Sequence, residues 1–175
     1  MVSDEHAIVS ANTQRSYYRN GQLCEEVHLR KGRKHGPVRI WTRSGVLASE
    51  VLYEDGLLHG VCRQWDEMGR LLGQYTMDHG TGTQITWHEN GQRLVEFSSI
   101  EGIPFGRSRL WLHDGTLIAE KIYLDGQSVS AAEYRAAAKA DERLPKLKGR
   151  SGRPLPDGPQ KEAKIHRVFV AGVLE

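Results

Sequence analysis

The sequence predicts an all-β repeat protein in which five β-hairpins stack in a single-layer antiparallel sheet, closed at its end by a C-terminal capping helix. Two observations predict the repeat. A glycine recurs at intervals of 22 to 24 residues, and an aromatic residue stands four residues before each of these glycines. Turn-forming dipeptides at most of the same glycines supply a third observation. Self-similarity at a fixed spacing indicates a stacked array, because each short unit buries little surface alone.

The repeat has two fixed points. The predicted turn glycines are Gly21, Gly45, Gly69, Gly91 and Gly115. The aromatic residues are Tyr17, Trp41, Trp65, Trp87 and Trp111. All four tryptophans of the chain stand in this one register, which indicates a packing position common to every unit.

The dipeptides at the glycines favour two-residue hairpin turns. Asn20-Gly21, Asn90-Gly91 and Asp114-Gly115 suit a turn in which both residues have positive φ. Ser44-Gly45 is a weaker signal and Met68-Gly69 a poor one, which leaves another turn type open for the third hairpin.

Two-residue turns pair each aromatic residue with a small or aliphatic one across the hairpin. The expected pairs are Tyr17 with Cys24, Trp41 with Ala48, Trp65 with Leu72, Trp87 with Leu94, and Trp111 with Ile118. Two residues farther out, the pairs are Arg15 with Glu26, Arg39 with Glu50, Arg63 with Gln74, and Arg109 with Glu120. Only Ile85, opposite Glu96, departs from this charge pairing. Because side chains alternate along a strand, the aromatic residues and the charged pairs share one face.

The chain divides into a repeat array and its ends. Residues 1–14 are expected to form an N-terminal cap and residues 15–127 the five hairpins, joined by links rich in glycine. A capping box at Ser130 and Glu133 predicts a helix within residues 128–143 that covers the last hairpin. The proline-rich, basic stretch 144–164 is expected to be an extended linker, and 165–175 a β-prone tail.

Three stretches resemble the MORN-repeat superfamily in its bacterial variant form. They are YYRNGQLCEEVHLRKGRKHG, WTRSGVLASEVLYEDGLLHG and WHENGQRLVEF. The resemblance covers about residues 15–127. It implies a twisted single-layer sheet with an interaction or scaffold role, and many bacterial members are labelled as antitoxins or immunity proteins.

Composition and motifs argue against catalysis and cofactors. The net charge of +2 lacks the strongly basic balance of a general nucleic-acid binder. Cys24 and Cys62 are too few for a thiolate zinc site. His35 and His59 occupy equivalent links roughly 10 Å apart, which is too far to share an ion. The remaining histidines considered, His79, His88 and His113, have no partner at ligand spacing in the sequence. We therefore predict no catalytic residues, no metal and no small-molecule substrate.

The predicted function is non-catalytic protein binding, with a toxin or the product of a neighbouring gene as the partner. The candidate contact residues are Tyr17, Trp41, Trp65, Trp87, Trp111, Arg39, Arg63, Arg109 and Phe169. The aromatic face has a second interpretation as the shared core of the stack. The stretch around Phe169 either docks on its own sheet or pairs with a partner's edge strand.

The alternative function is a peripheral membrane scaffold that uses the basic linker. Its charges are Lys146, Lys148, Arg150 and Arg153. No signal peptide and no apolar stretch of membrane-spanning length is visible, so a cytoplasmic location is expected. The irregular third repeat and the non-repeated tail are the expected places for function.

Overall fold

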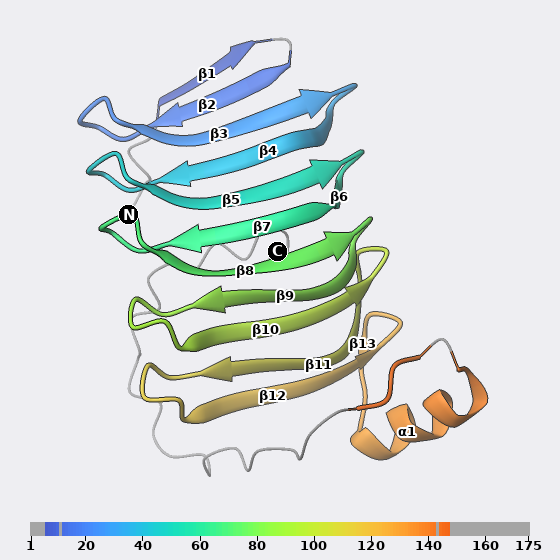
Figure 1. The fold of residues 1–175 in the computed structure, drawn as a ribbon. Helices are drawn as coiled ribbons and strands as arrows, with labels where there is room; N and C mark the ends of the chain where they lie inside the picture. The colour runs from blue at the N-terminus through green and yellow to red at the C-terminus, as the bar shows by residue number, and fades with distance from the viewer. Residues whose placement is uncertain (1–5, 11, 143, 148–175) are drawn as a thin grey trace.

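A computed structural model describes residues 6–10, 12–142 and 144–147 of the chain. In this part of the chain one antiparallel sheet follows sequence order, so each hairpin pairs with the hairpins before and after it (Figure 1). The predicted fold, an open sheet of stacked hairpins followed by a helix, is confirmed.

The five hairpins are β2–β3, β4–β5, β7–β8, β9–β10 and β11–β12. Their strands are β2 Thr13–Tyr17, β3 Leu23–Arg30, β4 Arg33–Trp41, β5 Leu47–Glu54, β7 Gly60–Trp65, β8 Leu71–Asp78, β9 Thr81–Trp87, β10 Arg93–Ile100, β11 Ile103–Trp111 and β12 Leu117–Leu124. Three shorter additions and the helix complete the fold: β1 His6–Ser10, β6 Leu57–Leu58, β13 Gln127–Ser128 and α1 Ala131–Ala140. β1 pairs with β2 and so extends the sheet by a strand within the predicted N-terminal cap.

The hairpin loops have three residues rather than the two expected from the sequence. In the first loop, the Tyr18 N–H donates to the Gln22 carbonyl and the Gly21 N–H to the Tyr18 carbonyl, both at 2.9 Å. Only the glycine has positive φ (81°), as in a type I turn followed by a bulge glycine. All five loops have this pair of hydrogen bonds. The loop at Met68-Gly69 is therefore no exception, and another turn type there is excluded.

The longer loop changes the partner of each aromatic residue by one position. The observed pairs are Tyr17 with Leu23, Trp41 with Leu47, Trp65 with Leu71, Trp87 with Arg93, and Trp111 with Leu117. An extra residue on the returning strand then forms a β-bulge, which restores the expected register beyond it. The predicted Arg–Glu pairs, the Arg63–Gln74 pair and the Ile85–Glu96 exception are consequently correct.

Two-residue turns occur instead at the links between hairpins. Lys31 and Gly32 have φ values of 50° and 76°, and both residues of a type I′ turn need positive φ. The other links share this conformation: Asp55-Gly56, His79-Gly80, Glu101-Gly102 and Asp125-Gly126. The right-handed twist of the strands favours this turn type, so the links rather than the loops contain the tightest bends.

Successive link turns are hydrogen-bonded to one another. The Gly80 N–H donates to the Leu58 carbonyl at 2.7 Å, and the Gly102 N–H donates to the Gly80 carbonyl at 3.0 Å. Gly56 and Gly126 donate in the same way to Lys34 and Pro104. The sheet is therefore joined by backbone contacts along the whole edge formed by the links.

The buried residues form two clusters. The first comprises Val27, Val38, Tyr53, Leu58 and Met77, from the first three hairpins. The second comprises Phe105, Ile122 and Tyr134, and joins α1 to the last hairpin. Each cluster draws on several strands, so the apolar packing also ties neighbouring hairpins together.

Helix α1 begins at the predicted capping box, with reciprocal hydrogen bonds between Ser130 and Glu133, and ends at Ala140. It is shorter than the predicted 128–143. The Tyr134 hydroxyl donates to the Pro145 carbonyl at 3.0 Å. Residues 144–147, expected to begin an extended linker, thus return to the helix. In the described part of the chain, no helix is long and apolar enough to cross a membrane.

Because the link turns lie so close together, replacing a glycine by alanine is expected to lower the free energy of unfolding more in a link turn than in a hairpin loop. Gly80 and Gly91 have nearly equal φ values, 78° and 80°. A Cβ on Gly80 would lie 2.5 Å from the Gly102 nitrogen, whereas a Cβ on Gly91 would meet nothing within 4 Å. We expect Gly91→Ala to cost about 1–2 kcal/mol through φ alone, and Gly80→Ala to cost clearly more. Urea unfolding of both variants measures the difference, and equal losses would show that the link turns can move apart freely.

Candidate functional site

A row of charged side chains crosses the sheet perpendicular to its strands. Arg15 Nε donates to Glu26 at 2.7 Å and Arg39 Nε to Glu50 at 2.8 Å. Longer ion pairs, of 3.5–3.7 Å, connect these units, from Arg39 to Glu26 and from Arg63 to Glu50. We call this row the charge ladder. Burial alone raises the pKa of Glu26, but hydrogen bonds from Arg15 and His28 outweigh it, so the pKa is lowered and this carboxylate is ionised near neutral pH.

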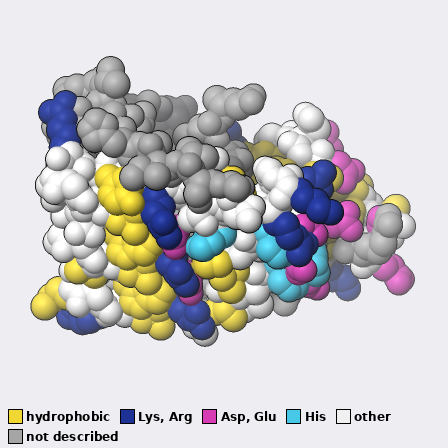
Figure 2. All heavy atoms as spheres, turned by 90° about the horizontal axis from the view of Figure 1, so that it is seen from above, with side chains coloured by type: hydrophobic (Ala, Val, Ile, Leu, Met, Phe, Trp, Pro, Cys, Tyr) yellow, Lys and Arg dark blue, Asp and Glu magenta, His cyan; other side chains and the backbone are white. Residues whose placement is uncertain are grey.

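The candidate aromatic residues end the first strand of each hairpin, two positions from the ladder. All five are half-buried. Figure 2 shows a column of hydrophobic side chains at the surface beside a column in which basic and acidic side chains alternate. The face therefore offers apolar and charged stripes side by side.

The charge ladder is interrupted in the middle of the sheet. Two neighbouring positions near its middle hold Gln74 and Ile85. The ladder resumes at Glu96, which pairs with Arg93 at 2.7 Å and lies 3.8 Å from Arg109. The interruption falls between the third and fourth hairpins, where the sequence is also irregular.

Backbone pairing is also sparse at the same place. Backbone pairing between β8 and β9 is limited to Met77 with Gly82 and Asp78 with Thr81. Farther along, the Gln64 side chain replaces the backbone ladder, since its Nε2 donates to the Trp87 carbonyl at 2.9 Å and its Oε1 accepts from the Trp87 N–H at 3.0 Å. We call this junction of β8 and β9 the seam.

Glycine is needed in the strand that Gln64 crosses. Gly73 pairs with Gln64 across the third hairpin. A Cβ at Gly73 would overlap the indole of Trp87, so the ring rests directly on the backbone of β8. The missing side chain thus leaves room both for Trp87 and for a hollow of about 300 Å³ beside it, whose lining includes Arg63, Trp65, Ile85 and Trp87.

Two arginines converge on one buried carboxylate in the last hairpin. Arg107 Nη1 and Arg109 Nε donate to the two oxygens of Glu120 at 2.7 and 2.8 Å. The side chains of Arg107 and Glu120 are only 5% and 8% exposed. Desolvated charges of this kind depend on their partners, which makes this end of the ladder structural rather than available for binding.

The two cysteines have no catalytic environment. Both are buried and neither forms a disulfide. Burial raises the pKa of the Cys62 thiol, and burial next to Cys62 raises the pKa of Tyr53 to about 12. A protonated, inaccessible thiol is a poor nucleophile, so these groups belong to the packing of the sheet.

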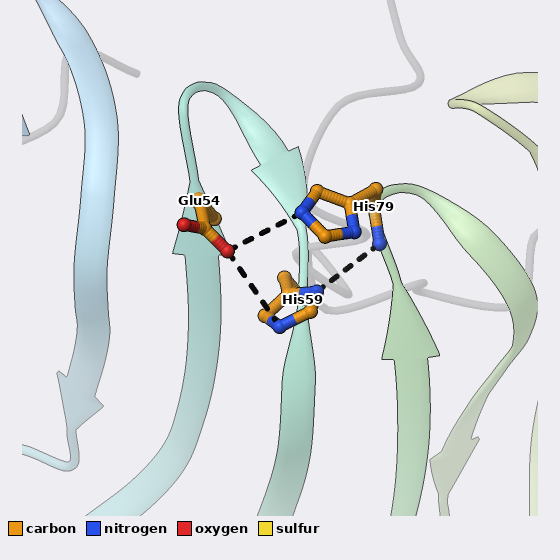
Figure 3. A group of neighbouring side chains, drawn as sticks. All are labelled: Glu54, His59 and His79. Carbon is orange, nitrogen blue, oxygen red and sulfur yellow. Dashed lines mark hydrogen bonds and ion pairs between the residues drawn. The ribbon is translucent and has the colours of Figure 1, made fainter.

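Three side chains at the link edge form a group that sequence spacing did not reveal. His59 precedes β7, His79 opens the turn between β8 and β9, and Glu54 ends β5 (Figure 3). The two imidazole rings lie 4.2 Å apart, centre to centre. The expectation that His79 has no partner at ligand spacing is therefore wrong. Successive link turns stack on one another, which brings together residues of different links that are 20 positions apart.

Carboxylates lie on both sides of the two rings. Glu54 Oε2 is 3.6 Å from His59 Nε2 and 3.3 Å from His79 Nε2. Asp78 Oδ1 is 2.7 Å from His79 Nδ1 and 3.4 Å from His59 Nδ1. The hydrogen bond to Asp78, with the nearby charges of Asp78 and Glu54, raises the pKa of His79. We call Glu54, His59 and His79 the His–Glu cluster.

The remaining sequence candidates are spread widely. Tyr17, Trp41 and Trp111 lie at the ends of β2, β4 and β11, away from the seam. Arg39, Arg63 and Arg109 all belong to the charge ladder. Phe169 and most of the basic linker lie outside the described residues. The sequence thus predicted the face that displays the aromatic and charged residues. It did not single out Gly73 and Gln64, on which the hollow at the seam depends.

The buried carboxylate predicts a large difference between two ion-pair variants. Glu120→Gln leaves Arg107 buried beside a neutral group, and we expect a loss of about 3–5 kcal/mol. As a control, Arg30→Gln removes a 2.8 Å pair with Asp55 in which both side chains are more than half exposed, at an expected cost of about 0–1 kcal/mol. Chemical denaturation compares the two, and similar losses would contradict the assignment of Glu120 as a structural charge.

Comparison with known proteins identifies the repeat. The sequence family of the MORN repeat variant matches residues 12–31 and 34–55, which cover the first two hairpins. No curated protein matches the chain. Among solved structures, one of accessory secretory proteins 1, 2 and 3 from Streptococcus pneumoniae is similar over 63% of this chain and 19% of its own, at 15% identity and a TM-score of 0.34.

A second solved structure, a GtfA/B complex bound to UDP and GlcNAc, is similar over 80% of this chain and 27% of its own, at 11% identity and a TM-score of 0.31. The chain thus spans about a fifth to a quarter of the length of these two solved chains. The hairpins that follow the matched pair keep the same loop, bulge and ladder positions. The first two hairpins therefore match the MORN repeat variant, and the later hairpins share their local structure.

Proposed function

We propose that this protein is a binding module that recognises another protein at the seam, on the face that displays the aromatic residues and the charge ladder. The observation that supports it most is the interruption of the ladder beside a hollow lined by Trp65, Ile85 and Trp87. An apolar side chain of a partner can enter there beside the single ladder ion pair of Arg63 with Glu50. Tryptophan next to arginine is the composition that dominates binding hot spots.

The family supports a binding role rather than a catalytic one. MORN repeats are in general modules that bind proteins or membranes, and the family is non-catalytic. The local chemistry agrees, because the ladder carboxylates are paired with arginines and the pKa of the buried Cys62 thiol is raised, which keeps it protonated at neutral pH.

The finer form of the proposal concerns the identity of the partner. If the partner is a toxin, the protein acts as an antitoxin or immunity protein, and the toxin's activity must be suppressed in the complex. The alternative is a peripheral membrane scaffold, for which the described part of the linker contributes the exposed Lys146. Co-sedimentation with anionic liposomes at low salt, and its loss at high salt, distinguishes that function.

Removing the two indoles at the seam tests the proposed surface. The tagged chain is purified from its native cell, the bound protein is identified by mass spectrometry, and the affinity is measured with purified components. We expect the double variant Trp65→Ala, Trp87→Ala to lose about 2 kcal/mol or more, which is roughly a 30-fold rise in Kd. Trp41→Ala removes the equivalent ring away from the hollow and serves as the control.

A second variant separates binding from folding. Ile85→Arg installs the residue found at the same ladder position in the other four hairpins, opposite Glu96. We expect the free energy of unfolding to change by less than about 1 kcal/mol, while a charge in the hollow lowers the affinity for the partner at least tenfold. Wild-type affinity in this variant would place the partner elsewhere, with residues 148–175 as the next region to examine.

A further inference from the structure

The His–Glu cluster presents three ligand atoms that converge on one point. Single ligand atoms of Glu54, His59 and His79 all lie within 4.8 Å of one another. Figure 3 shows the Glu54 carboxylate directed at both imidazole rings. Glu54 comes from the end of β5, and the two histidines come from the two links that follow it. Three converging ligands with solvent on the open side are the arrangement that a catalytic or exchangeable zinc ion occupies, with water as the fourth ligand.

Two of the three separations between ligand atoms are close to those around a tetrahedral ion, and the third is within 4.8 Å. Bonds of about 2.0–2.1 Å to nitrogen and oxygen place two tetrahedral ligands roughly 3.3 Å apart. Glu54 Oε2 lies 3.3 Å from His79 Nε2 and 3.6 Å from His59 Nε2. Only small side-chain rotations are then needed to complete the coordination. Two imidazoles and one carboxylate favour zinc and similar transition metals over magnesium or calcium, which prefer oxygen ligands alone.

Asp78 supplies the outer contacts that orient such ligands. Its Oδ1 lies 2.7 Å from Nδ1 of His79. A carboxylate can only accept, so in the neutral ring Nδ1 holds the proton and Nε2 keeps its lone pair on the side of Glu54. A carboxylate behind a metal-binding histidine is the usual way of fixing ring orientation and raising ligand basicity. The same oxygen is 3.4 Å from Nδ1 of His59 and can accept its proton in the same manner.

His59 has a competing contact that metal binding must replace. Without an ion, its Nδ1 accepts a long hydrogen bond of 3.3 Å from the backbone N–H of His79. Coordination through Nε2 requires the other tautomer, in which Nδ1 carries the proton and turns to Asp78. The exchanged hydrogen bond is long and therefore weak, so the change of tautomer costs little.

The preceding repeat has the same link geometry but lacks the full set of three ligands. Arg30, His35 and Asp55 occupy the positions equivalent to Glu54, His59 and His79, and Asp55 N–H contacts His35 Nδ1 at 3.4 Å just as His79 N–H contacts His59. There, Arg30 pairs with Asp55 at 2.8 Å and places a cation where the cluster has a carboxylate. The link geometry therefore exists independently of the cluster, and substitutions at two of the three positions, Arg30 to Glu54 and Asp55 to His79, convert an ion pair into a set of ligands.

We propose that Glu54, His59 and His79 bind one zinc ion, or a transition-metal ion of similar preference, with Asp78 as the residue that positions the two imidazoles. The ion ties the end of β5 and the loop before β7 to the turn between β8 and β9. That turn belongs to the seam, where backbone pairing is limited to two residue pairs. The bound metal thus joins the link before the third hairpin to the link that follows it. This inference does not depend on the proposed partner.

Titration of the full-length chain with zinc tests the site. The protein is treated with chelator, dialysed, and titrated with ZnCl₂ in a calorimeter, and Co²⁺ is used as a visible-absorption probe of coordination. We expect one ion per chain at this site, a four-coordinate cobalt spectrum, and a higher melting temperature on adding zinc because the ligand binds only the folded state.

Three variants remove ligands while keeping the local fold. His79→Asn suits the positive φ of 43° at that turn position, His59→Asn keeps an acceptor for the His79 N–H, and Glu54→Gln keeps the shape. Each is expected to weaken zinc binding at least tenfold and to remove the thermal shift. Asp78→Asn is expected to weaken it roughly tenfold or more, the usual effect of losing an outer contact.

His35→Asn is the matched control, because it changes the equivalent histidine in a link whose neighbour is Arg30. It is expected to bind zinc like the wild type. The proposal is overturned if the wild-type chain binds no zinc, if His79→Asn and Glu54→Gln bind it as tightly as the wild type, or if His35→Asn weakens binding as much as they do. Melting temperatures of the metal-free variants near that of the wild type confirm that folding is intact.

Discussion

Hydrogen bonds between successive link turns hold the hairpins of this sheet at a constant spacing along one edge. Each link glycine from Gly56 onward donates its N–H to a carbonyl of the link before it. The opposite edge, formed by the hairpin loops, is joined differently. There side chains reach the next hairpin, as when the Tyr18 hydroxyl donates to the Trp41 carbonyl at 2.7 Å. One edge is thus fixed by backbone geometry, while the other depends on which side chains the loops carry.

This asymmetry explains why the two ends of the seam differ. At its link end, β8 and β9 are paired through their backbones, and His79 projects from the turn that joins them. At its loop end, Gln64 bridges to Trp87 and the hollow opens beside it. The His–Glu cluster and the hollow therefore lie at opposite ends of the same junction.

Sequence patterns predicted the repeat because its period is set by local requirements: a glycine with positive φ, an aromatic residue, and a charge pair in each unit. The Arg–Glu pairing was predictable even though the assumed turn was wrong. The loop has one residue more than assumed, and the bulge at Cys24 and its equivalents compensates for it beyond the aromatic residue. The partner of Tyr17 lies between the longer loop and the bulge, so the predicted partner, Cys24, is one residue away from the observed one, Leu23.

The cluster and the hollow could not be predicted in the same way, because both depend on contacts between units. His59 and His79 are 20 positions apart, a spacing that recurs for His35 with Asp55 and for Thr81 with Glu101 wherever one link turn hydrogen-bonds to the next. This recurring spacing of 20 residues marks the positions that lie next to each other in successive links. It can be interpreted only once the links are known to stack. Gln64 and Gly73 gave no signal, since each looks ordinary within its own strand.

The bridge from Gln64 to Trp87 also makes one side chain chemically irreplaceable. Its amide both donates to the Trp87 carbonyl and accepts from the Trp87 N–H. Deamidation to glutamate keeps the acceptor but sets a negative oxygen against the carbonyl, and asparagine is one methylene too short to span Gly73. The spontaneous ageing of a single glutamine can therefore loosen the loop end of the seam, while the link end stays paired through the backbone.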